Sequence, residues 1–245
     1  MDEKIELLKK WIDKSDSIVF FGGAGVSTES GVPDFRSKDG LYNQHDVRFD
    51  NFSPEYLLSH SCLVNNPDVF FEFYRQKMDA RGVMPNDAHK FLARLEKSGK
   101  LSAIVTQNID GLHQKAGSKC VYEIHGTTMR NYCIRCHKKY DENFIYDSKE
   151  RIPRCECGGM VRCDVTLYEE QLPQEAVSGA VSAISRADML IIGGTSLTVY
   201  PAASYIGYFH GMHLVVINRD KLSIPLREGQ DLEINDSIGK VFAQL

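Results

Sequence analysis

The sequence predicts an α/β fold in which a doubly wound parallel sheet carries two inserted modules. Short apolar stretches alternate with amphipathic helical stretches, which is typical of parallel strands joined by helices. Three of the apolar stretches end in a glycine or a polar residue, at Gly22, Gly193 and Asn218. Because doubly wound sheets bind their ligands at the carboxyl ends of the strands, these three ends predict a ligand site.

Length, charge and composition narrow the class of protein. The chain has 245 residues, of which 42% are hydrophobic and 25% charged, so a large core is expected and disorder is not. Its net charge of −4 provides no overall basic field, so we predict no direct nucleic-acid partner. No apolar run reaches the roughly 18 residues of a membrane span. We therefore expect a cytoplasmic protein whose seven cysteines are metal ligands or thiols rather than disulfides.

The first predicted element is an amphipathic helix at the N-terminus. Leu7, Leu8, Trp11 and Ile12 lie at helical spacing and are expected to face the core. The charged residues around them favour such a helix over a signal peptide, which needs an uncharged apolar centre. A buried strand is predicted next, at residues 17–21.

A glycine turn follows this strand and is the first candidate functional element. Glycines let a backbone approach a phosphate, and N–H groups at a helix start attract an anion, so the turn predicts a phosphate site that opens a helix. Gly23 and Gly25 match the dinucleotide fingerprint G-x-G-x-x-G, but Thr28 stands at its third glycine. A tight turn without function is the alternative. The aromatic ring and the cation in residues 33–36 favour the phosphate site, because a plain turn does not need them.

The next stretch, residues 38–66, is irregular, polar and aromatic. Long irregular segments inside compact domains are usually functional, so we interpret it as a flap over a nucleotide, followed by a small helical module. Helices are predicted at residues 54–60, 67–78 and 86–99, the last with an Asn or Asp N-cap.

The rest of the chain supplies the remaining strands and one long helix. Strands are predicted at residues 102–106, 121–124, 161–168, 187–194 and 213–218, and the helix at residues 176–185. Between residues 133 and 157 the composition shifts to Cys, Lys and Arg with few large aliphatic residues, which indicates an inserted module.

Four of the seven cysteines form two close pairs, which predicts a zinc site. Eighteen residues separate the pairs, which suits one tetrahedral zinc with four thiolates and no open position, so the zinc is expected to be structural. Four unrelated buried cysteines, or a redox pair, are the alternatives. The predicted ligands are Cys133, Cys136, Cys155 and Cys157. The remaining cysteines are interpreted as small packing residues: Cys62, Cys120 and Cys163.

Two further strand ends carry residues suited to chemistry. Gln107, Asn108 and Asp110 follow a buried strand and could hydrogen-bond ribose hydroxyls or an amide, with a capped loop start as the alternative. His125 follows another strand, and imidazole is the side chain best matched to proton transfer near neutral pH, so we predict a catalytic role for it. The histidines without such a context are interpreted as structural or solvated: His89, His113, His137 and His210.

Together these motifs resemble the sirtuins, NAD-dependent protein-lysine deacylases, of the bacterial type. The resemblance covers nearly the whole chain. It rests on the order of residues 23–27 with 33–36, residues 106–110, residues 125–126, the four cysteines and residues 194–197. It implies a large Rossmann-like domain and a small zinc domain, with NAD and the acyl-lysine entering the cleft between them from opposite sides.

The resemblance also implies a set of NAD-binding residues. In chain order they are Ala24, Thr28, Phe35, Arg36, Gln107, Asn108, Ile109, Asp110, His125, Thr195, Ser196, Asn218 and Ile238. The first two would line the pyrophosphate site, and the next two belong to the flap over the ribose and nicotinamide. Residues 107–110 would hold the nicotinamide ribose and carboxamide, and the last four would meet the adenosine.

The catalytic residues that the resemblance implies are His125, Asn108 and Asp110. In the implied reaction the acyl oxygen attacks the anomeric carbon of NAD and nicotinamide leaves. His125 then helps deprotonate a ribose hydroxyl, which attacks the resulting imidate. The products are free lysine, nicotinamide and O-acyl-ADP-ribose.

The substrate side resembles the family, with two departures in the peptide strand and one indication of acyl preference in the flap. The segment on which sirtuins lay the acyl-lysine peptide, through backbone hydrogen bonds, is matched by Val165, Thr166, Leu167 and Tyr168. Cys163 stands where a proline is usual and Thr166 where a valine is usual, so a looser strand entry and an altered acyl tunnel are expected. Tyr42 is followed at the third position by His45, not by the arginine of sirtuins that prefer acidic acyl groups. This favours acetyl or another uncharged acyl group.

The predicted domains are a Rossmann-like NAD-binding domain (residues 1–35, 86–125 and 165–245), a flap with a helical module (36–85) and a zinc-binding module (126–164). Mono-ADP-ribosyl transfer at the same site and a scaffold without turnover are the alternative functions. An NAD-dependent dehydrogenase is disfavoured, because no acidic residue stands about 20 positions on in a βαβ unit. The expected partners are acyl-lysine proteins, and the sequence does not determine the oligomeric state.

Overall fold

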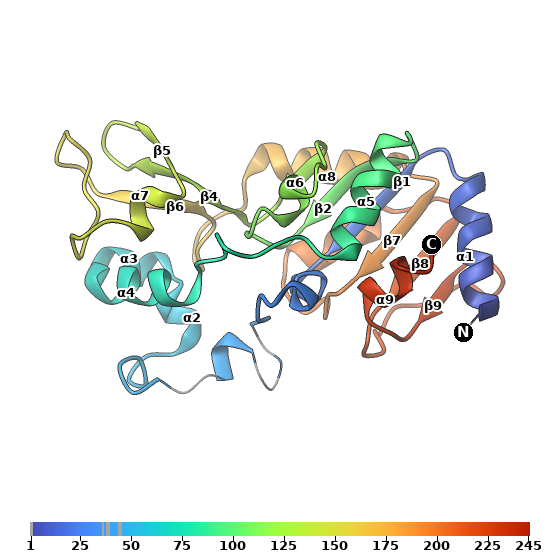
Figure 1. Cartoon of the computed structure of the whole chain (residues 1–245), viewed down its shortest axis with the longest axis horizontal. Helices are drawn as coiled ribbons and strands as arrows, with labels where there is room; N and C mark the ends of the chain where they lie inside the picture. The colour runs from blue at the N-terminus through green and yellow to red at the C-terminus, as the bar shows by residue number, and fades with distance from the viewer. Residues whose placement is uncertain (1, 36, 38–39, 44–45) are drawn as a thin grey trace.

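The structure, a computed structural model, has two lobes of unequal size (Figure 1). It describes residues 2–35, 37, 40–43 and 46–245. Arg36 of the predicted flap and His45 of the acyl-preference motif therefore lie outside the described residues. The larger lobe holds a parallel sheet, and the smaller lobe holds an antiparallel sheet and a group of short helices.

Six parallel strands form the sheet of the large lobe, in the order β3-β2-β1-β7-β8-β9. They are β1 (Ile18–Gly22), β2 (Leu101–Thr106), β3 (Val121–Glu123), β7 (Met189–Gly193), β8 (His213–Ile217) and β9 (Leu232–Ile234). The chain runs outward from β1 to β3 and then returns to β7 on the other side of β1. This reversal confirms the predicted doubly wound, Rossmann-like sheet, and such a reversal point is where these sheets bind ligands. β9 has no counterpart among the predicted strands.

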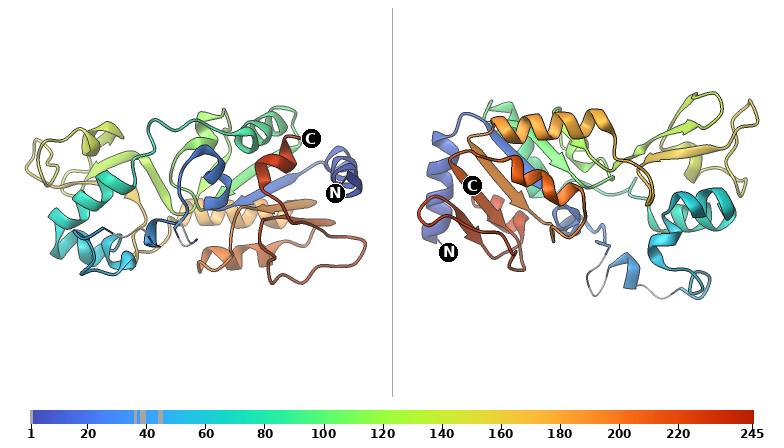
Figure 2. Two further views of the ribbon diagram at one scale, coloured as in Figure 1. Left: turned by 60° about the horizontal axis from the view of Figure 1, so that its bottom comes forward. Right: turned by 180° about the vertical axis from the view of Figure 1, so that it is seen from behind.

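Helices cover both faces of this sheet (Figure 2). On one face lie α1 (Asp2–Lys14), α5 (Asp87–Lys97) and α9 (Ile238–Phe242), and on the other lie α8 (Gln174–Arg186) and the 3-10 helix η4 (Ala202–Tyr208). Because successive strand residues point to opposite faces, Phe20 packs with the first group and Phe21 with the second. Within the described part of the chain, no helix has the length and apolar character needed to cross a membrane.

The N-terminal helix α1 buries a stripe slightly different from the predicted one. Ile5, Leu8 and Ile12 are buried, and Trp11 is 8% exposed. Leu7 is 38% exposed, so the prediction that it faces the core was wrong. The buried stripe advances from Ile5 in steps of three and four residues, and Leu7 falls on the neighbouring face of the helix.

The small lobe packs the two inserted modules against each other. Its antiparallel sheet has the order β5-β4-β6, and four short helices accompany it. These elements are α2 (Pro54–Leu57), α3 (His60–Asn65), α4 (Pro67–Lys77), β4 (Gly126–Cys133), β5 (Lys139–Asp141), α7 (Asn143–Tyr146) and β6 (Val161–Val165). Phe70 and Phe71 of α4 share a hydrophobic cluster with Ile145 of α7 and Cys163 of β6. The strand predicted at residues 161–168 is therefore shorter, and it belongs to the small sheet.

No α-helix opens after the glycine turn in residues 23–35, all of which the structure describes, so that prediction was wrong. Two 3-10 turns follow β1 instead, at Ala24–Val26 and Thr28–Ser30. The Thr28 hydroxyl donates to the carbonyl of Gly25 (3.0 Å), and Gly31 adopts a left-handed conformation with φ of 90°. A left-handed glycine ends helical geometry, so the turn stays short and its N–H groups remain at the end of β1.

Candidate active site

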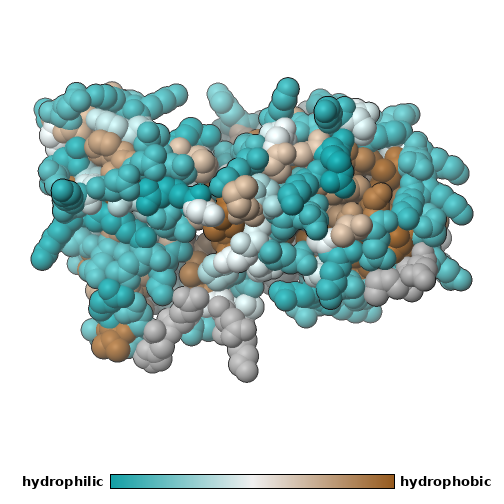
Figure 3. Space-filling view, in the orientation of Figure 1, coloured by the Kyte–Doolittle hydropathy of each residue, from teal (hydrophilic) through white to brown (hydrophobic). Residues whose placement is uncertain are grey.

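A cavity of about 1120 Å³ joins the carboxyl ends of the central strands to the small lobe. Figure 3 shows apolar side chains in the hollow between the two lobes. The structure brings most of the predicted site residues to its wall. They are Ala24, Thr28, Phe35, Gln107, Asn108, Ile109, His125, Val165, Thr166, Leu167, Tyr168, Thr195, Ser196, Asn218 and Ile238. Of the predicted NAD-site residues that the structure describes, Asp110 is the one that does not line the cavity.

The glycine turn brings the ends of β1 and β7 together at the base of the cavity. Gly25 donates its N–H to the carbonyl of Gly194 (2.8 Å). A Cβ atom at Gly25 would lie 2.8 Å from the Cα of Gly194, and one at Gly23 would lie 2.8 Å from the Cβ of Thr195. Glycine is therefore required here by the packing of two strand ends, in addition to the backbone approach that a phosphate needs.

Glu29, which the sequence reasoning missed, ties this turn to the C-terminal helix. Its carboxylate accepts the N–H of Gly239 in α9 (2.7 Å), and its side chain lines the cavity. The neighbouring Ile238 is 2% exposed and packs against Gly193. Ile238 is thus a core residue that closes the predicted adenosine end. Glu29 offered no sequence signal, because its partner is 210 positions away.

The loop after β2 is held by bonds to the neighbouring strand ends. The backbone N–H of Gln107 donates to the carbonyl of Gly22 (2.9 Å), and its side-chain amide donates to Oγ1 of Thr195 (3.1 Å). Asn108 is 9% exposed and donates from Nδ2 to Oγ of Ser27 (3.0 Å). The two amide side chains are thus oriented at the cavity wall by the protein itself.

Asp110 lies behind the cavity wall rather than on it. Its carboxylate accepts the hydroxyl proton of Ser27 (2.7 Å) and the N–H of Leu112 (2.9 Å), which begins helix α6 (Leu112–Lys115). Burial raises the pKa of this carboxyl group, and the hydrogen bond from Ser27 opposes the rise. Ser27, another residue that the sequence reasoning missed, therefore links Asp110 to Asn108. Direct contact of Asp110 with NAD remains a prediction.

His125 stands where the chain passes from the large sheet to the small one. Its neighbour Gly126 has φ of 73°, and a Cβ there would collide with the carbonyl of Asp164. Nδ1 of His125 lies 3.0 Å from the carbonyl oxygen of Gln107. Because a carbonyl oxygen only accepts, Nδ1 carries the proton of the neutral imidazole and Nε2 is its basic nitrogen.

The described part of the flap joins the predicted peptide segment. The ring of Phe35 packs edge-on against Tyr42, with centroids 5.5 Å apart. The hydroxyl of Tyr42 lies 2.9 Å from the hydroxyl of Tyr168. The flap therefore closes the cavity on the side of residues 165–168.

At the predicted adenosine end, the polar side chains follow β7 and β8, as the strand-end argument predicts. Oγ of Ser196 lies 2.8 Å from Oγ1 of Thr198, and Asn218 donates to the carbonyl of Asp220 (2.8 Å). Oγ1 of Thr195 accepts the N–H of Leu197 (3.2 Å). These bonds hold a short polar rim at one end of the cavity.

Three backbone N–H groups of the predicted peptide segment, those of residues 166–168, are already used within the chain. Thr166 donates to the carbonyl of His125 (2.9 Å), and Leu167 donates to the carboxylate of Glu170 (2.9 Å). The backbone N–H of Tyr168 donates to the carbonyl of Leu58, just before α3 (3.0 Å). An incoming peptide must therefore pair with carbonyl groups of this segment or with another segment.

The cysteine at position 163 does not break the local structure. Cys163 is fully buried in β6 and is paired with Asn131 of β4, so the strand continues without the usual proline. The turn after β6 is held by Arg162, which ion-pairs with Glu170 and donates to the carbonyl of Val165 (2.8 Å). The looser strand entry expected from Cys163 is thus not seen.

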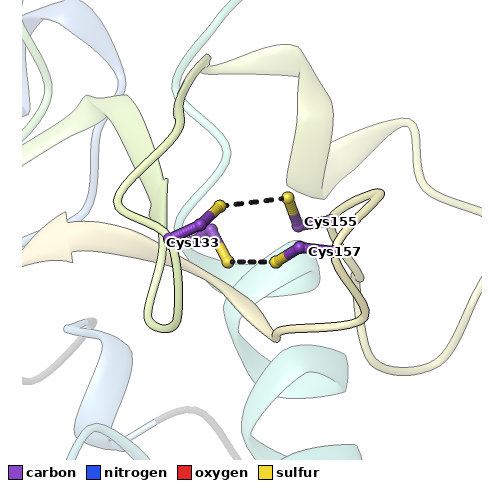
Figure 4. A group of neighbouring side chains, drawn as sticks. Cys133, Cys155 and Cys157 are labelled. Carbon is purple, nitrogen blue, oxygen red and sulfur yellow. Dashed lines mark hydrogen bonds between the residues drawn. The ribbon is translucent and has the colours of Figure 1, made fainter.

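The four predicted zinc ligands come together at one end of the small sheet, and Figure 4 labels Cys133, Cys155 and Cys157. Their Sγ atoms all lie within 4.8 Å of one another, with 3.5 Å between Cys133 and Cys157 and 3.6 Å between Cys136 and Cys155. Four sulfurs about 2.3 Å from one zinc ion lie about 3.8 Å apart, so the cluster fits a structural zinc site. Gly159 is also required here, because a Cβ would lie 2.7 Å from the Sγ of Cys133.

Two histidines interpreted as structural or solvated are buried side by side beneath the site. His89 and His113 have ring centroids 4.8 Å apart, and within the described residues neither ring nitrogen of His113 has a hydrogen-bond partner. Burial lowers the pKa of His89 to about 4 and that of His113 to about 3, with His89 contributing to the second shift. Both imidazoles are therefore neutral in the folded protein near neutral pH.

This pair predicts acid sensitivity. In the unfolded chain both rings protonate near pH 6.5, so between pH 6.5 and about 4 the unfolded state binds more protons and the free energy of unfolding falls as the pH falls. At pH 5 each histidine is expected to cost about 2 kcal/mol relative to pH 8. Urea unfolding at both pH values measures the loss. The variant His113→Phe is expected to remove about half of it, whereas the exposed-site control His210→Gln is expected to remove none. An unchanged pH dependence in His113→Phe would contradict the prediction.

The fold and the site define a class of α/β protein. Its cavity lies where the strand order of the parallel sheet reverses, which is where such sheets bind nucleotides, and its second lobe contains a four-cysteine zinc site. The Sir2 family model matches residues 23–201. This chain belongs to the Sir2 family, the sirtuins.

Full-length relatives support this assignment. The chain is 57% identical to an NAD-dependent protein deacetylase of Clostridium perfringens (strain 13 / Type A), covering 100% of this chain and 99% of that one. It is 54% identical to an NAD-dependent protein deacetylase of Clostridium acetobutylicum, covering 98% and 97%. A Sir2 structure with a deacetylated p53 peptide and 3'-O-acetyl-ADP-ribose superposes with a TM-score of 0.87 at 32% identity, covering 98% and 96%. A Sir2 structure bound to acetylated peptide gives 0.84 at 32% identity, with the same coverage.

Proposed function

We infer that this chain is an NAD-dependent protein-lysine deacetylase that releases nicotinamide and forms O-acetyl-ADP-ribose. The observation that carries this function is a single cavity whose wall includes the glycine turn, the loop of Gln107 and Asn108, His125, and residues 165–168. A nucleotide and an acyl-lysine can therefore meet at one imidazole. The relatives at 57% and 54% identity are NAD-dependent protein deacetylases.

Each of these residues has a role that follows from its position in the cavity. Gly23 and Gly25 allow close approach of a pyrophosphate, and the amides of Gln107 and Asn108 orient the nicotinamide half. NAD, when bound, supplies the ADP-ribosyl group that takes over the acetyl group. His125 accepts a proton at Nε2, because the bond to Gln107 keeps the proton of the neutral ring at Nδ1.

The acyl group enters from the side of the small lobe. The cavity wall there includes Phe35, Ile109, Val165 and Leu167, which are apolar. A carboxylate on the acyl chain would be desolvated by these side chains without a described cation among them, so acetyl and other uncharged acyl groups are the proposed substrates. Proteins that carry acetyl-lysine are the proposed partners.

Two further points stay predictions from sequence. One is the division into residues 1–35, 86–125 and 165–245, residues 36–85, and residues 126–164. The other is a cytoplasmic location.

The test is to mix the protein with NAD and an acetyl-lysine peptide and to identify products by mass spectrometry. We expect nicotinamide, deacetylated peptide and O-acetyl-ADP-ribose in equal amounts, with no nicotinamide when the peptide is unacetylated. Nicotinamide release with ADP-ribose attached to protein would instead indicate a mono-ADP-ribosyltransferase. NAD binding without any product would indicate a scaffold.

A further inference from the structure

The hydroxyl group of Ser27 is the centre of a buried hydrogen-bond network below the cavity. It donates to Oδ2 of Asp110 (2.7 Å) and receives Nδ2 of Asn108 (3.0 Å). Nε2 of His89 lies 3.5 Å from the same oxygen. Ser27 is 1% exposed and His89 is fully buried, so water does not reach this junction from the surface.

The donor count of the Ser27 hydroxyl leaves one lone pair that faces His89. A serine hydroxyl has one proton and two acceptor lone pairs. The proton is used by the Asp110 carboxylate and one lone pair by the Asn108 amide, so the second lone pair remains for His89. A proton at Nε2 of His89 would point at this lone pair across a separation of 3.5 Å.

The N-terminal cap of helix α5 brings both a donor and an acceptor of Asn86 to Nδ1 of His89. Asn86 caps the helix with Oδ1, which accepts the N–H of Ala88 (2.9 Å), and its own backbone N–H donates to Nδ1 of His89 (3.3 Å). The Nδ1 atom also lies 3.0 Å from Oδ1 of Asn86, the contact that the opposite tautomer would use. The Asn86 amide additionally donates to the carbonyl of Val26 (2.7 Å). The first turn of α5 therefore contacts the glycine turn at Val26 and at the adjacent Ser27.

We propose that His89 is a positioning residue for the NAD site: through Nε2–H it orients the Ser27 hydroxyl, which holds the Asn108 amide and the Asp110 carboxylate in their binding geometry. His89 does not touch the cavity, whereas Asn108 lines it. This inference rests on the proposed function for its ligand, and it assigns a role at the site to a histidine that its sequence context marked as structural.

Two variants separate positioning from support of the helix. His89→Gln keeps an acceptor for the N–H of Asn86 and a donor for Ser27, whereas His89→Met fills similar space with neither. We expect His89→Met to weaken NAD and ADP-ribose binding by at least about tenfold in titration calorimetry, the effect of one buried hydrogen bond. We expect the KM for acetyl-lysine peptide to change by less than about threefold. His89→Gln should restore nucleotide affinity to within about threefold of wild type.

The control for helix stability is Asp87→Asn, which removes an exposed charge from the first turn of α5 without touching Ser27. It is expected to bind NAD as wild type does. All titrations are done below the thermal transition of the least stable variant.

A direct readout is the ¹⁵N spectrum of the imidazole, which is expected to show His89 protonated at Nε2 and not at Nδ1 near pH 7.5. Protonation at Nδ1, or wild-type NAD affinity in a folded His89→Met, would overturn the proposal. These readouts do not need turnover. A wild-type protein that binds NAD but forms no O-acetyl-ADP-ribose would refute the proposed function and leave the positioning role open to the same test of affinity.

Discussion

Replacing His125 by alanine is expected to lower kcat/KM for an acetyl-lysine peptide by at least about 10²-fold, the usual contribution of a positioned general base. The reason is that His125 is the histidine on the cavity wall and its ring is held in one tautomer by the carbonyl of Gln107. That carbonyl is itself held, because the backbone N–H of Gln107 donates to Gly22. Steady-state kinetics with a labelled peptide measures the loss, and calorimetry with ADP-ribose is expected to show binding within about threefold of wild type.

The matched variant is His125→Asn, whose side-chain amide can still donate to the Gln107 carbonyl but has no basic nitrogen. It is expected to lose as much activity as alanine, which separates proton transfer from ring positioning. His210→Ala changes an exposed histidine and is the control. Full activity in His125→Ala would refute its role as the base, whatever the structure of the variant.

Replacing Cys155 by serine is expected to remove the zinc ion and to destabilise the small lobe. Structural zinc contributes about 10–16 kcal/mol to the folding of small metal modules, and a serine hydroxyl does not replace a thiolate ligand. Elemental analysis should fall from one zinc per chain to none, and the midpoint of thermal unfolding should fall by at least about 10 °C. Deacetylation should be lost as well, because β4 leads from His125 to Cys133 and β6 leads from the zinc end to the peptide segment.

The control is Cys120→Ser, which changes a cysteine outside the cluster and is expected to keep one zinc and wild-type stability. Chelation of wild-type protein should reproduce the Cys155→Ser phenotype, and added zinc should reverse it. Wild-type protein that contains no zinc, or a zinc-free protein with an unchanged midpoint, would contradict the structural role.

Features carried by neighbouring residues were predictable from the sequence. The apolar runs of β1, β7 and β8 and the polar residues at their ends are local patterns, and they predicted both the sheet and the edge where the cavity lies. The cysteine pairs are local in the same way, because each pair sits on one turn. The N-cap of α5 was predicted for the same reason, since Asn86 is adjacent to the helix that it caps.

Features that join distant residues were not predictable. Asn108 and Asp110 lie 81 and 83 positions from Ser27 along the chain, and His89 lies 62 positions from it. No local pattern shows that these side chains share one hydroxyl. The helix expected after the glycine turn failed for a related reason, because Gly25 donates to Gly194 of another strand end instead of continuing a helix.

The sequence by itself determined the α/β class, the strand-end location of the site, the four zinc ligands and the histidine at the cavity. Each of these features is specified by residue types and their spacing within short segments of the chain. The tertiary structure decided which backbone groups of residues 166–168 are already used, that Asp110 stands behind the wall, and that Glu29 reaches α9. These outcomes depend on how strand ends and two lobes pack in three dimensions. A buried polar group takes whichever partner the packing brings within hydrogen-bond distance, and its position in the sequence does not reveal that partner.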